Sequence, residues 1–177
     1  MVTSETAALV EKARLRDPEA LGALCSSFYP KILRYMQYRV GQRFADDLAA
    51  EVFLKAIRGI GGQTGNFVAW LYRIASNVVA DHARSQKMRR EGPISDALTE
   101  RLAGGADPAR EVGRALDIQK AMGHLTDEQR EMVTLKFIEG LSNAEIAEIT
   151  GRTDDAIRHL QFRAMSSLRR ILGGEEK

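Results

Sequence analysis

The sequence predicts an all-α protein with two small helical domains, residues 1–90 and 107–177, joined by a flexible acidic linker at 91–106. Three observations support this fold class. Apolar residues recur at helical spacing along nearly the whole chain, and no stretch alternates apolar and polar residues as a strand does. The interval 91–106 is rich in glycine and acidic residues and poor in large apolar ones. The last third of the chain has the spacing of a helix-turn-helix motif.

Length and composition limit the class of protein. A chain of 177 residues with 44% hydrophobic and 28% charged residues is typical of a soluble protein with one domain or two small ones. No apolar run is long enough for membrane insertion, and the N-terminus lacks a signal-peptide pattern, so we expect a cytoplasmic protein. The single cysteine, Cys25, excludes an internal disulfide and a cysteine-rich zinc site.

Charge is distributed unevenly, although the net charge is only +2. The interval 84–90 contains basic residues and no acids, the interval 91–111 contains more acids than arginines, and the interval 152–170 contains more arginines than acids. Two basic patches separated by an acidic stretch indicate two DNA-facing modules and a linker.

Cap and turn residues divide the N-terminal domain into helices. The first amphipathic helix should end near Arg16, and Asp17-Pro18 is a good N-cap and first-turn pair for the second helix. We expect Pro30 to break or kink this second helix and Gly41 to terminate the segment.

The next helix has one apolar and one acidic face. The apolar residues that would pack on the core are Phe44, Leu48, Val52, Phe53, Ala56 and Ile57. The opposite face contains Asp46, Asp47 and Glu51. Adjacent carboxylates can bind a metal or act as an acid–base pair, but no histidine or third carboxylate joins them at a ligand-like spacing. The acidic face is therefore either solvated or a docking surface for a basic partner.

A glycine-rich loop at 59–65 precedes a long helix that Asn66 should cap. This loop is not a phosphate-binding loop, because no Lys-Ser or Lys-Thr follows it. Trp70 lies among apolar residues and could be plain core. The same helix offers stacking, hydrogen-bonding and cationic groups in Tyr72, Arg73, Asn77 and Arg84. Such groups suit a melted nucleic acid, whose bases can be flipped and stacked.

Further cap signals organise the C-terminal domain. Asp107-Pro108 should begin its first helix, which is expected to end at Gly123. A capping box of Thr126 and Gln129 should begin the following helix, which is expected to stop at Gly140.

Residues 141–160 have the features of a helix-turn-helix. Ser142 and Glu145 form a capping box, Gly151 supplies the positive φ of a tight turn, and Thr153 caps the second helix. Two aliphatic residues of that helix point into the core, Ile157 and Leu160. Its outer surface and margins then consist of Arg158, His159, Gln161, Phe162 and Arg163. The geometry suits insertion into a major groove, and the alternative is a plain helical hairpin.

In three places, in the same order, the chain resembles a bacterial sigma factor of the extracytoplasmic-function (ECF) group, within the sigma-70 family. Residues 45–56 (Ala-Asp-Asp-Leu-Ala-Ala-Glu-Val-Phe-Leu-Lys-Ala) resemble the segment that docks on the clamp helices of RNA polymerase. Residues 67–77 (Phe-Val-Ala-Trp-Leu-Tyr-Arg-Ile-Ala-Ser-Asn) resemble the segment that melts and reads the promoter −10 element. Residues 125–170 resemble the domain that reads the −35 element.

The resemblance implies a non-enzymatic initiation factor without a cofactor, whose partners are the β and β′ subunits of core RNA polymerase, promoter DNA and a cognate anti-sigma factor. It implies a polymerase-docking face of Asp46, Asp47, Leu48, Glu51, Val52 and Phe53. It implies −10 contacts by Phe67, Trp70, Asn77, Arg84, Lys87, Arg89 and Arg90. It implies −35 contacts by Arg152, Thr153, Arg158, His159, Gln161, Phe162 and Arg163.

The second helix of the motif departs from the family pattern. Asp155-Ala156-Ile157 stands where the family often has Gly-Thr-Val, and Leu160 stands where it often has a further arginine, so the base preference does not transfer. The rival interpretation is a helix-turn-helix regulator that binds DNA without docking on polymerase and would need no clamp-docking segment. An enzyme is disfavoured, because the histidines are scattered and no nucleophile–base–acid set emerges.

Overall fold

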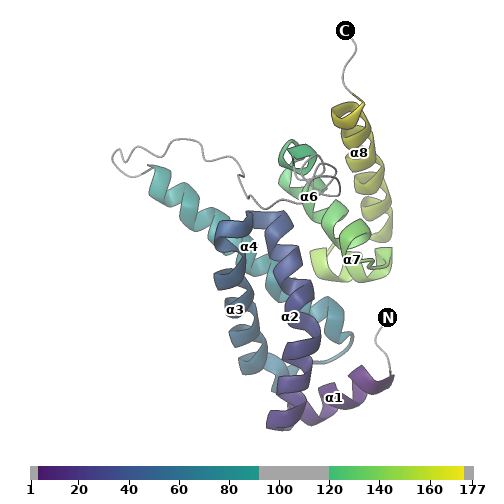
Figure 1. The fold of residues 1–177 in the computed structure, drawn as a ribbon. Coiled ribbons are helices and arrows are strands. Elements are labelled where there is room, and N and C mark those ends of the chain that lie inside the picture. The colour runs from purple at the N-terminus through teal and green to yellow at the C-terminus, as the bar shows by residue number, and fades with distance from the viewer. Residues whose placement is uncertain (1–3, 92–119, 174–177) are drawn as a thin grey trace, which may run out of the picture.

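The computed structural model describes residues 4–91 and 120–173, and every regular element within these two ranges is helical. The first range contains α1 (Ser4–Arg14), α2 (Pro18–Val40), α3 (Gln42–Gly59), the 3₁₀ turn η1 (Ile60–Gly62) and α4 (Phe67–Glu91). The second contains α6 (Asp127–Val133), the π-helical turn η2 (Thr134–Ile138), α7 (Asn143–Thr150) and α8 (Asp154–Leu172). Helices α1–α4 form one bundle, and α6–α8 form a second bundle beside it (Figure 1). The all-α prediction is confirmed.

The helix starts follow the predicted caps. One oxygen of the Asp17 carboxylate accepts hydrogen bonds from the backbone N–H groups of Glu19 (2.9 Å) and Ala20 (3.0 Å), which begins α2. The side-chain oxygen of Asn66 accepts from the N–H groups of Val68 (3.0 Å) and Ala69 (3.3 Å), which begins α4. These hydrogen bonds confirm both predicted caps. Each cap depends on only a few neighbouring residues, so the sequence alone could predict it.

Pro30 does not break its helix, so the prediction of a break there is wrong. Helix α2 continues through it to Val40, and Gly41, with φ of 83°, makes the turn into α3. The proline is exposed, whereas Phe28 and Ile32 on either side are 6% and 0% exposed. We infer that burial of these neighbours offsets the loss of one helical hydrogen bond at the exposed face.

The C-terminal bundle contains both predicted capping boxes and one feature that the sequence did not predict. Thr126 pairs with Gln129 at the start of α6, and Ser142 pairs with Glu145 at the start of α7. Gly151, with φ of 68°, turns the chain into α8. Between α6 and α7 the helix widens into the π-helical turn η2, closed by Glu139 N–H donating to the carbonyl of Thr134 (3.0 Å).

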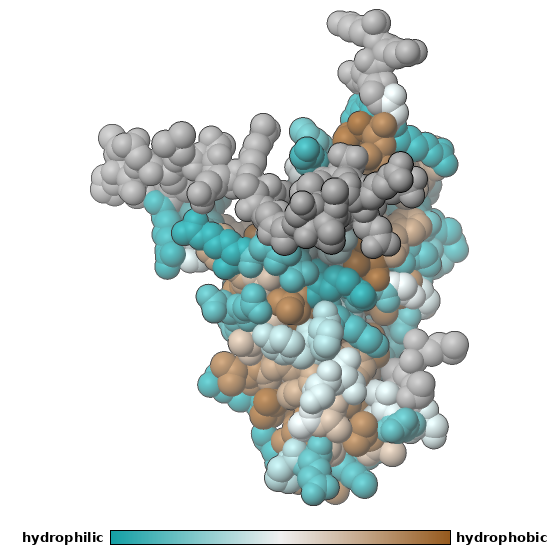
Figure 2. Space-filling view, in the orientation of Figure 1, coloured by the Kyte–Doolittle hydropathy of each residue, from teal (hydrophilic) through white to brown (hydrophobic). Residues whose placement is uncertain are grey.

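The largest core joins the two bundles, and a second, smaller cluster of Met122, Leu125, Val133 and Ala164 lies in the C-terminal bundle. A single cluster of buried residues joins side chains of α2 and α4 to Met132, Leu135, Leu141 and Ile146 of the second bundle. The face in view mixes hydrophilic and hydrophobic residues over this core (Figure 2). The buried apolar area between the bundles therefore stabilises their association.

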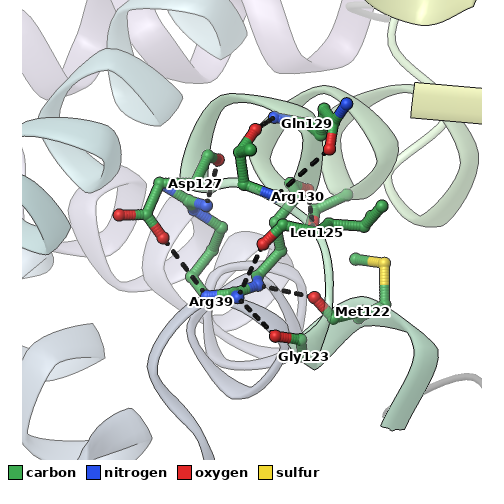
Figure 3. A network of polar contacts seen from close by, with 9 residues as sticks. Arg39, Met122, Gly123, Leu125, Asp127, Gln129 and Arg130 are labelled. Carbon is green, nitrogen blue, oxygen red and sulfur yellow. Dashed lines mark hydrogen bonds and ion pairs between the residues drawn. The ribbon is translucent and has the colours of Figure 1, made fainter. Parts of the chain in front are cut away.

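Two arginines from different bundles meet at the loop before α6. Arg39 of α2 donates to the carbonyl of Asp127 (2.9 Å). Arg130 of α6 donates back to the carbonyls of Met122 (2.9 Å), Gly123 (3.3 Å) and Leu125 (3.2 Å), so the loop lies between the two guanidinium groups (Figure 3). These bonds hold the start of α6 against the end of α2.

Several sequence predictions fall outside the described residues. The linker at 91–106, apart from its first residue in α4, and the helix expected from Asp107-Pro108 lie in the range 92–119. The described residues 120–123 are helical, and the chain turns at His124, one residue after the predicted stop at Gly123. Within the described ranges, the helices are too short or too polar to cross a bilayer.

Candidate functional site

Helix α3 presents an outward face with an apolar centre and acidic margins. Asp46 and Asp47 are exposed at its first turns, followed by exposed Ala50 and by Leu54, whose side chain is 56% exposed. Glu51 lies beside them and forms an ion pair with Lys55 at 2.9 Å. The exposed leucine adds apolar area to a face that otherwise carries three carboxylates. We call Asp46, Asp47, Ala50, Glu51 and Leu54 the α3 face.

The structure corrects part of the predicted docking set. Leu48 and Val52 are 9% and 0% exposed and point into the core, so neither can contact a partner directly. Phe53 is half-buried against Tyr29, with ring centroids 5.6 Å apart. Leu54 was missed, although its spacing of seven residues from Asp47 puts it on the same face and could have identified it.

A cavity of about 510 Å³ opens between α3 and α4. Its lining residues are Lys55, Gly59, Trp70, Ile74, Asn77, Asp81 and Arg84. Along α4 these positions recur every three or four residues, so they form one face of the helix. Gly59 lies against the indole, and a Cβ there would be in van der Waals contact with Cζ2 of Trp70 at 3.4 Å. The cavity combines an aromatic ring, an exposed amide and cations, which are the groups that hold an unstacked base and its phosphates.

Asp81 is a lining residue that the sequence analysis missed. Its carboxylate forms an ion pair with Arg84 and lies 3.6 Å from Nζ of Lys55. The hydrogen bond from Arg84 and the positive charges of Arg84 and Lys55 hold the pKa of Asp81 below its ordinary value. The carboxylate is therefore ionised at neutral pH and partly neutralises two cations at the mouth of the cavity.

The predicted −10 residues divide between core and surface. Phe67 is 5% exposed and packs edge-on against Phe28 (5.3 Å between centroids) and beside Trp70 (5.8 Å), so its assignment as a direct DNA contact is withdrawn. Trp70 is half-buried at the cavity, and Asn77 is exposed. Further along the same helix, Arg84 and Arg89 line a second surface cavity of about 560 Å³. Lys87 is exposed, and the side chain of Arg90 lies outside the described residues.

Helix α8, the second helix of the helix-turn-helix, begins at the predicted Thr153 cap. The hydroxyl of Thr153 accepts from the N–H of Ala156 at 3.2 Å. Arg158 is exposed and forms ion pairs with Asp154 (2.5 Å) and Asp155 (2.6 Å), and the hydrogen bond that it donates to Asp155 raises the pKa of the guanidinium. Arg152, in the turn, pairs with Glu128 of α6 at 2.5 Å.

The outer surface of α8 agrees with the sequence prediction. Ile157 and Leu160 are 0% and 3% exposed and anchor the helix on its neighbours. His159, Phe162 and Arg163 are exposed, with Phe162 at 72%, and Gln161 is half-buried. A helix with exposed polar and basic side chains, anchored along its opposite stripe, has the shape of a recognition helix.

Comparison with known proteins places these features in one family. The model described as Sigma-70 region 2 matches residues 24–89, and the model described as Sigma-70, region 4 matches residues 115–168. The chain is 40% identical over 171 residues to the ECF RNA polymerase sigma factor BldN of Streptomyces coelicolor, covering 93% of this chain and 64% of the relative. It is 33% identical over 173 residues to the ECF sigma factor SigD of Mycobacterium tuberculosis, covering 92% and 81%. The chain thus spans slightly less than two thirds of the length of BldN.

Two solved structures share the fold at low sequence identity. One is CnrH in complex with the cytosolic domain of CnrY, with a TM-score of 0.72, 22% identity, and coverage of 95% of this chain and 97% of that chain. The other is the sigma factor RpoE in complex with the anti-sigma factor NepR from Bartonella quintana, with a TM-score of 0.69, 21% identity, and coverage of 88% and 98%. The two family models and the relative SigD show that the chain belongs to the ECF group of sigma-70 family sigma factors.

Proposed function

We propose that the chain binds core RNA polymerase, directs it to promoters with defined −10 and −35 elements, and performs no chemical step itself. The observation that carries this proposal is the presence in one chain of three separate surfaces: the α3 face, the cavity between α3 and α4, and the outer surface of α8. A regulator that binds DNA alone would need only the last of these. Because its proposed target is chromosomal DNA, we expect the chain to act in the cytoplasm.

The α3 face is the proposed polymerase-docking surface. Asp46, Asp47 and Glu51 supply negative charge for steering towards a basic partner, and the exposed Leu54 supplies apolar area at the centre. Leu48, Val52 and Phe53 act by holding the helix on the core. The proposed partner is therefore a basic surface of the polymerase core with an apolar centre.

The cavity between α3 and α4 is the proposed −10 site. Trp70 offers a ring for stacking, and Asn77 offers an amide that can both donate to and accept from an unpaired base. Arg84, Lys87, Arg89 and Arg90 follow along α4 as proposed phosphate contacts. Phe67 has a supporting role, because it packs against the indole of Trp70.

The outer surface of α8 is the proposed −35 site. Arg158 lies near the N-terminal end of the helix, the end that reaches base edges in a major groove. Arg163 lies further along and is assigned to phosphate. Arg152, Thr153, His159, Gln161 and Phe162 complete the proposed surface. The functional modules are then residues 1–90 and 107–177, with 91–106 as the linker.

A cognate anti-sigma factor is a further proposed partner. The support is that CnrH and RpoE, which share this fold, are seen in complex with CnrY and with the anti-sigma factor NepR respectively.

The proposed function is tested by size-exclusion chromatography with core polymerase and by run-off transcription. We expect co-elution with the core and transcription that depends on both proteins. A chain that binds promoter DNA alone and does not co-elute with the core would instead be a regulator of the rival class.

A further inference from the structure

Lys55 belongs to two of the proposed functional surfaces at once. It follows Glu51 of the α3 face by one helical turn, and its ammonium lies 2.9 Å from that carboxylate. The same ammonium lies 3.6 Å from Oδ2 of Asp81 in α4, and Lys55 lines the cavity between the two helices. Its side chain is 41% exposed, so it can change partners without disturbing the core. One cation therefore joins the α3 face to the proposed −10 site.

Asp81 extends this contact to a second cation. Its carboxylate forms an ion pair with Arg84, which follows it by one turn of α4 and lines the same cavity. Charges of alternating sign thus run from the α3 face into the cavity, in the order Glu51, Lys55, Asp81 and Arg84. We call these four residues the ion-pair chain. Because Asp81 holds Arg84, part of the charge of that guanidinium is neutralised before any phosphate arrives.

The two acids do not hold Lys55 equally. The contact with Glu51 is at hydrogen-bond distance, whereas 3.6 Å is too long for a good hydrogen bond to Asp81. The hydrogen bond to Glu51 is also the largest cause of the raised pKa of Lys55, and Asp81 contributes less. In the free protein, Glu51 is thus the main partner of Lys55, and Asp81 is the main partner of Arg84.

Docking on a basic partner would change these pairings. Exposed ion pairs are weak and are screened by water, so a cation of the partner can replace Lys55 at Glu51. The displaced ammonium then has Asp81 as its nearest acid, and its flexible stem allows it to move closer. A second cation at Asp81 competes with Arg84 for the same carboxylate. The guanidinium is then released for a contact with DNA phosphate.

We propose that Lys55 is a positioning residue that couples polymerase docking at Glu51 to phosphate binding by Arg84 at the −10 site. The inference rests on the proposed roles of the α3 face and of the cavity. The coupling is reciprocal, so DNA held by Arg84 raises the affinity for core polymerase by the same factor. Because each exposed pair contributes little, the expected factor is about twofold to fivefold.

The test measures binding of single-stranded DNA to the free, full chain. The probe is a fluorescent oligonucleotide of about 12 nucleotides and mixed sequence, titrated at several salt concentrations and followed by anisotropy. Glu51→Gln imitates the docked state, because it removes the charge and keeps the shape of the side chain. The measurement is made near pH 8, where His82 is neutral, since burial lowers its pKa and it also senses the charge of Glu51.

Three further variants complete the test. Glu11→Gln is the matched control, because it breaks a similar exposed ion pair, with Arg14 at 3.0 Å, on α1. Lys55→Met and Arg84→Met each interrupt the ion-pair chain and serve as backgrounds for Glu51→Gln. If Glu51→Gln acts through the chain, its effect is lost in both backgrounds, whereas a direct effect of its charge on DNA remains.

We expect Glu51→Gln to bind the oligonucleotide about twofold to fivefold more tightly than wild type, with a slope of log affinity against log salt steeper by about 0.7. Glu11→Gln should match wild type. In Lys55→Met and in Arg84→Met, adding Glu51→Gln should leave the slope unchanged. With saturating core polymerase, wild type and Glu51→Gln should have the same slope, because docking has already occupied Glu51.

Separate outcomes reject the proposal and the assigned site. An unchanged affinity in Glu51→Gln, a steeper slope that persists in Lys55→Met or Arg84→Met, or a difference that persists on core polymerase would overturn the coupling alone. If no variant bound the oligonucleotide even at low salt, the −10 assignment of the cavity would fail together with the coupling. If one background does not fold by circular dichroism, the other provides the test.

Discussion

Nη2 of Arg158 lies 2.6 Å from Oδ1 of Asp155, and Nη1 of the same guanidinium lies 2.5 Å from Asp154. The arginine proposed to read a base is thus restrained by two carboxylates of its own first turn. All three side chains are well exposed, so water and salt screen these pairs and an incoming base or phosphate can replace them. The ion pairs are those of the free protein, and the proposed base contact would replace them on DNA.

Arg158→Ala should relax the −35 preference at one or two positions and leave the −10 preference unchanged. An arginine that donates to O6 and N7 of guanine discriminates by about 1–3 kcal/mol. The measurement is selection from a promoter library with core polymerase. An unchanged −35 preference would reject the base contact.

Asp155→Asn is the informative companion to this variant. The substitution removes a negative charge that would repel the DNA phosphates, so it should strengthen binding to all DNA sequences alike. The slope of log affinity against log salt should become steeper by about one. If the base preference were lost at a single promoter position only, Asp155 itself would contact a base.

Asp47→Arg combined with Leu54→Ala should weaken binding to core polymerase without unfolding the chain. Both side chains are exposed on the α3 face, and substitutions of this kind usually change the free energy of unfolding by about 0.5 kcal/mol or less. Glu5→Arg, an equivalent charge change on exposed α1, is the control. Pull-down and thermal unfolding should be compared for all three proteins. Equal polymerase affinity would remove the docking assignment.

Asn77→Ala should impair promoter opening more than formation of the closed complex. Its proposed partner is an unstacked base, which exists only after melting. Arg89→Ala is the contrasting variant, since a lost phosphate contact should weaken binding across sequences and reduce the salt slope by about one. Permanganate footprinting reports the melted bases. Normal melting in Asn77→Ala would contradict the assignment of the cavity.

The capping box of α7 should make stability depend on pH. Partial burial opposes ionisation of Glu145, but hydrogen bonds from the Ser142 backbone and hydroxyl and from Asn66 outweigh it and lower the pKa of the carboxyl. A lowered folded-state pKa contributes stability above the unfolded-state pKa, near 4.5, and this contribution is lost as pH falls through the folded-state pKa. Glu145→Ala should cost about 1 kcal/mol at pH 7.

That cost should shrink below about pH 4, where the wild-type carboxylate becomes protonated. Glu145→Gln retains a capping side chain without a titrating group, so its stability difference from Glu145→Ala should not change over this range. Urea unfolding at several pH values between 3 and 7 measures both differences. A cost for Glu145→Ala that stays constant down to pH 3 would mean that the capping box does not depend on the charge.

The features that the sequence predicted well are local ones. The caps at Asp17, Asn66, Thr126, Ser142 and Thr153 depend on a few neighbouring residues, and each forms in the structure. The turn at Gly151 and the outward position of Phe162 follow from helical spacing alone. The starts of these helices could therefore be predicted from the sequence.

The features that the sequence missed depend on contacts between distant residues. Pro30 stays helical because of packing that no local rule contains, and Phe67 is buried because Phe28, 39 positions away, lies across it. Glu139 reaches Arg34 from the position directly after η2, whose π-helical form has no local sequence signature. The shared core therefore followed from neither periodicity nor composition.

Run-off transcription from a randomised promoter library, with purified core polymerase and the full chain, tests the central claim most directly. The account predicts that transcripts appear only when both proteins are present, and that the selected promoters share two separate motifs, near −10 and near −35. Transcription that does not require the chain, or selected promoters without either motif, would contradict it.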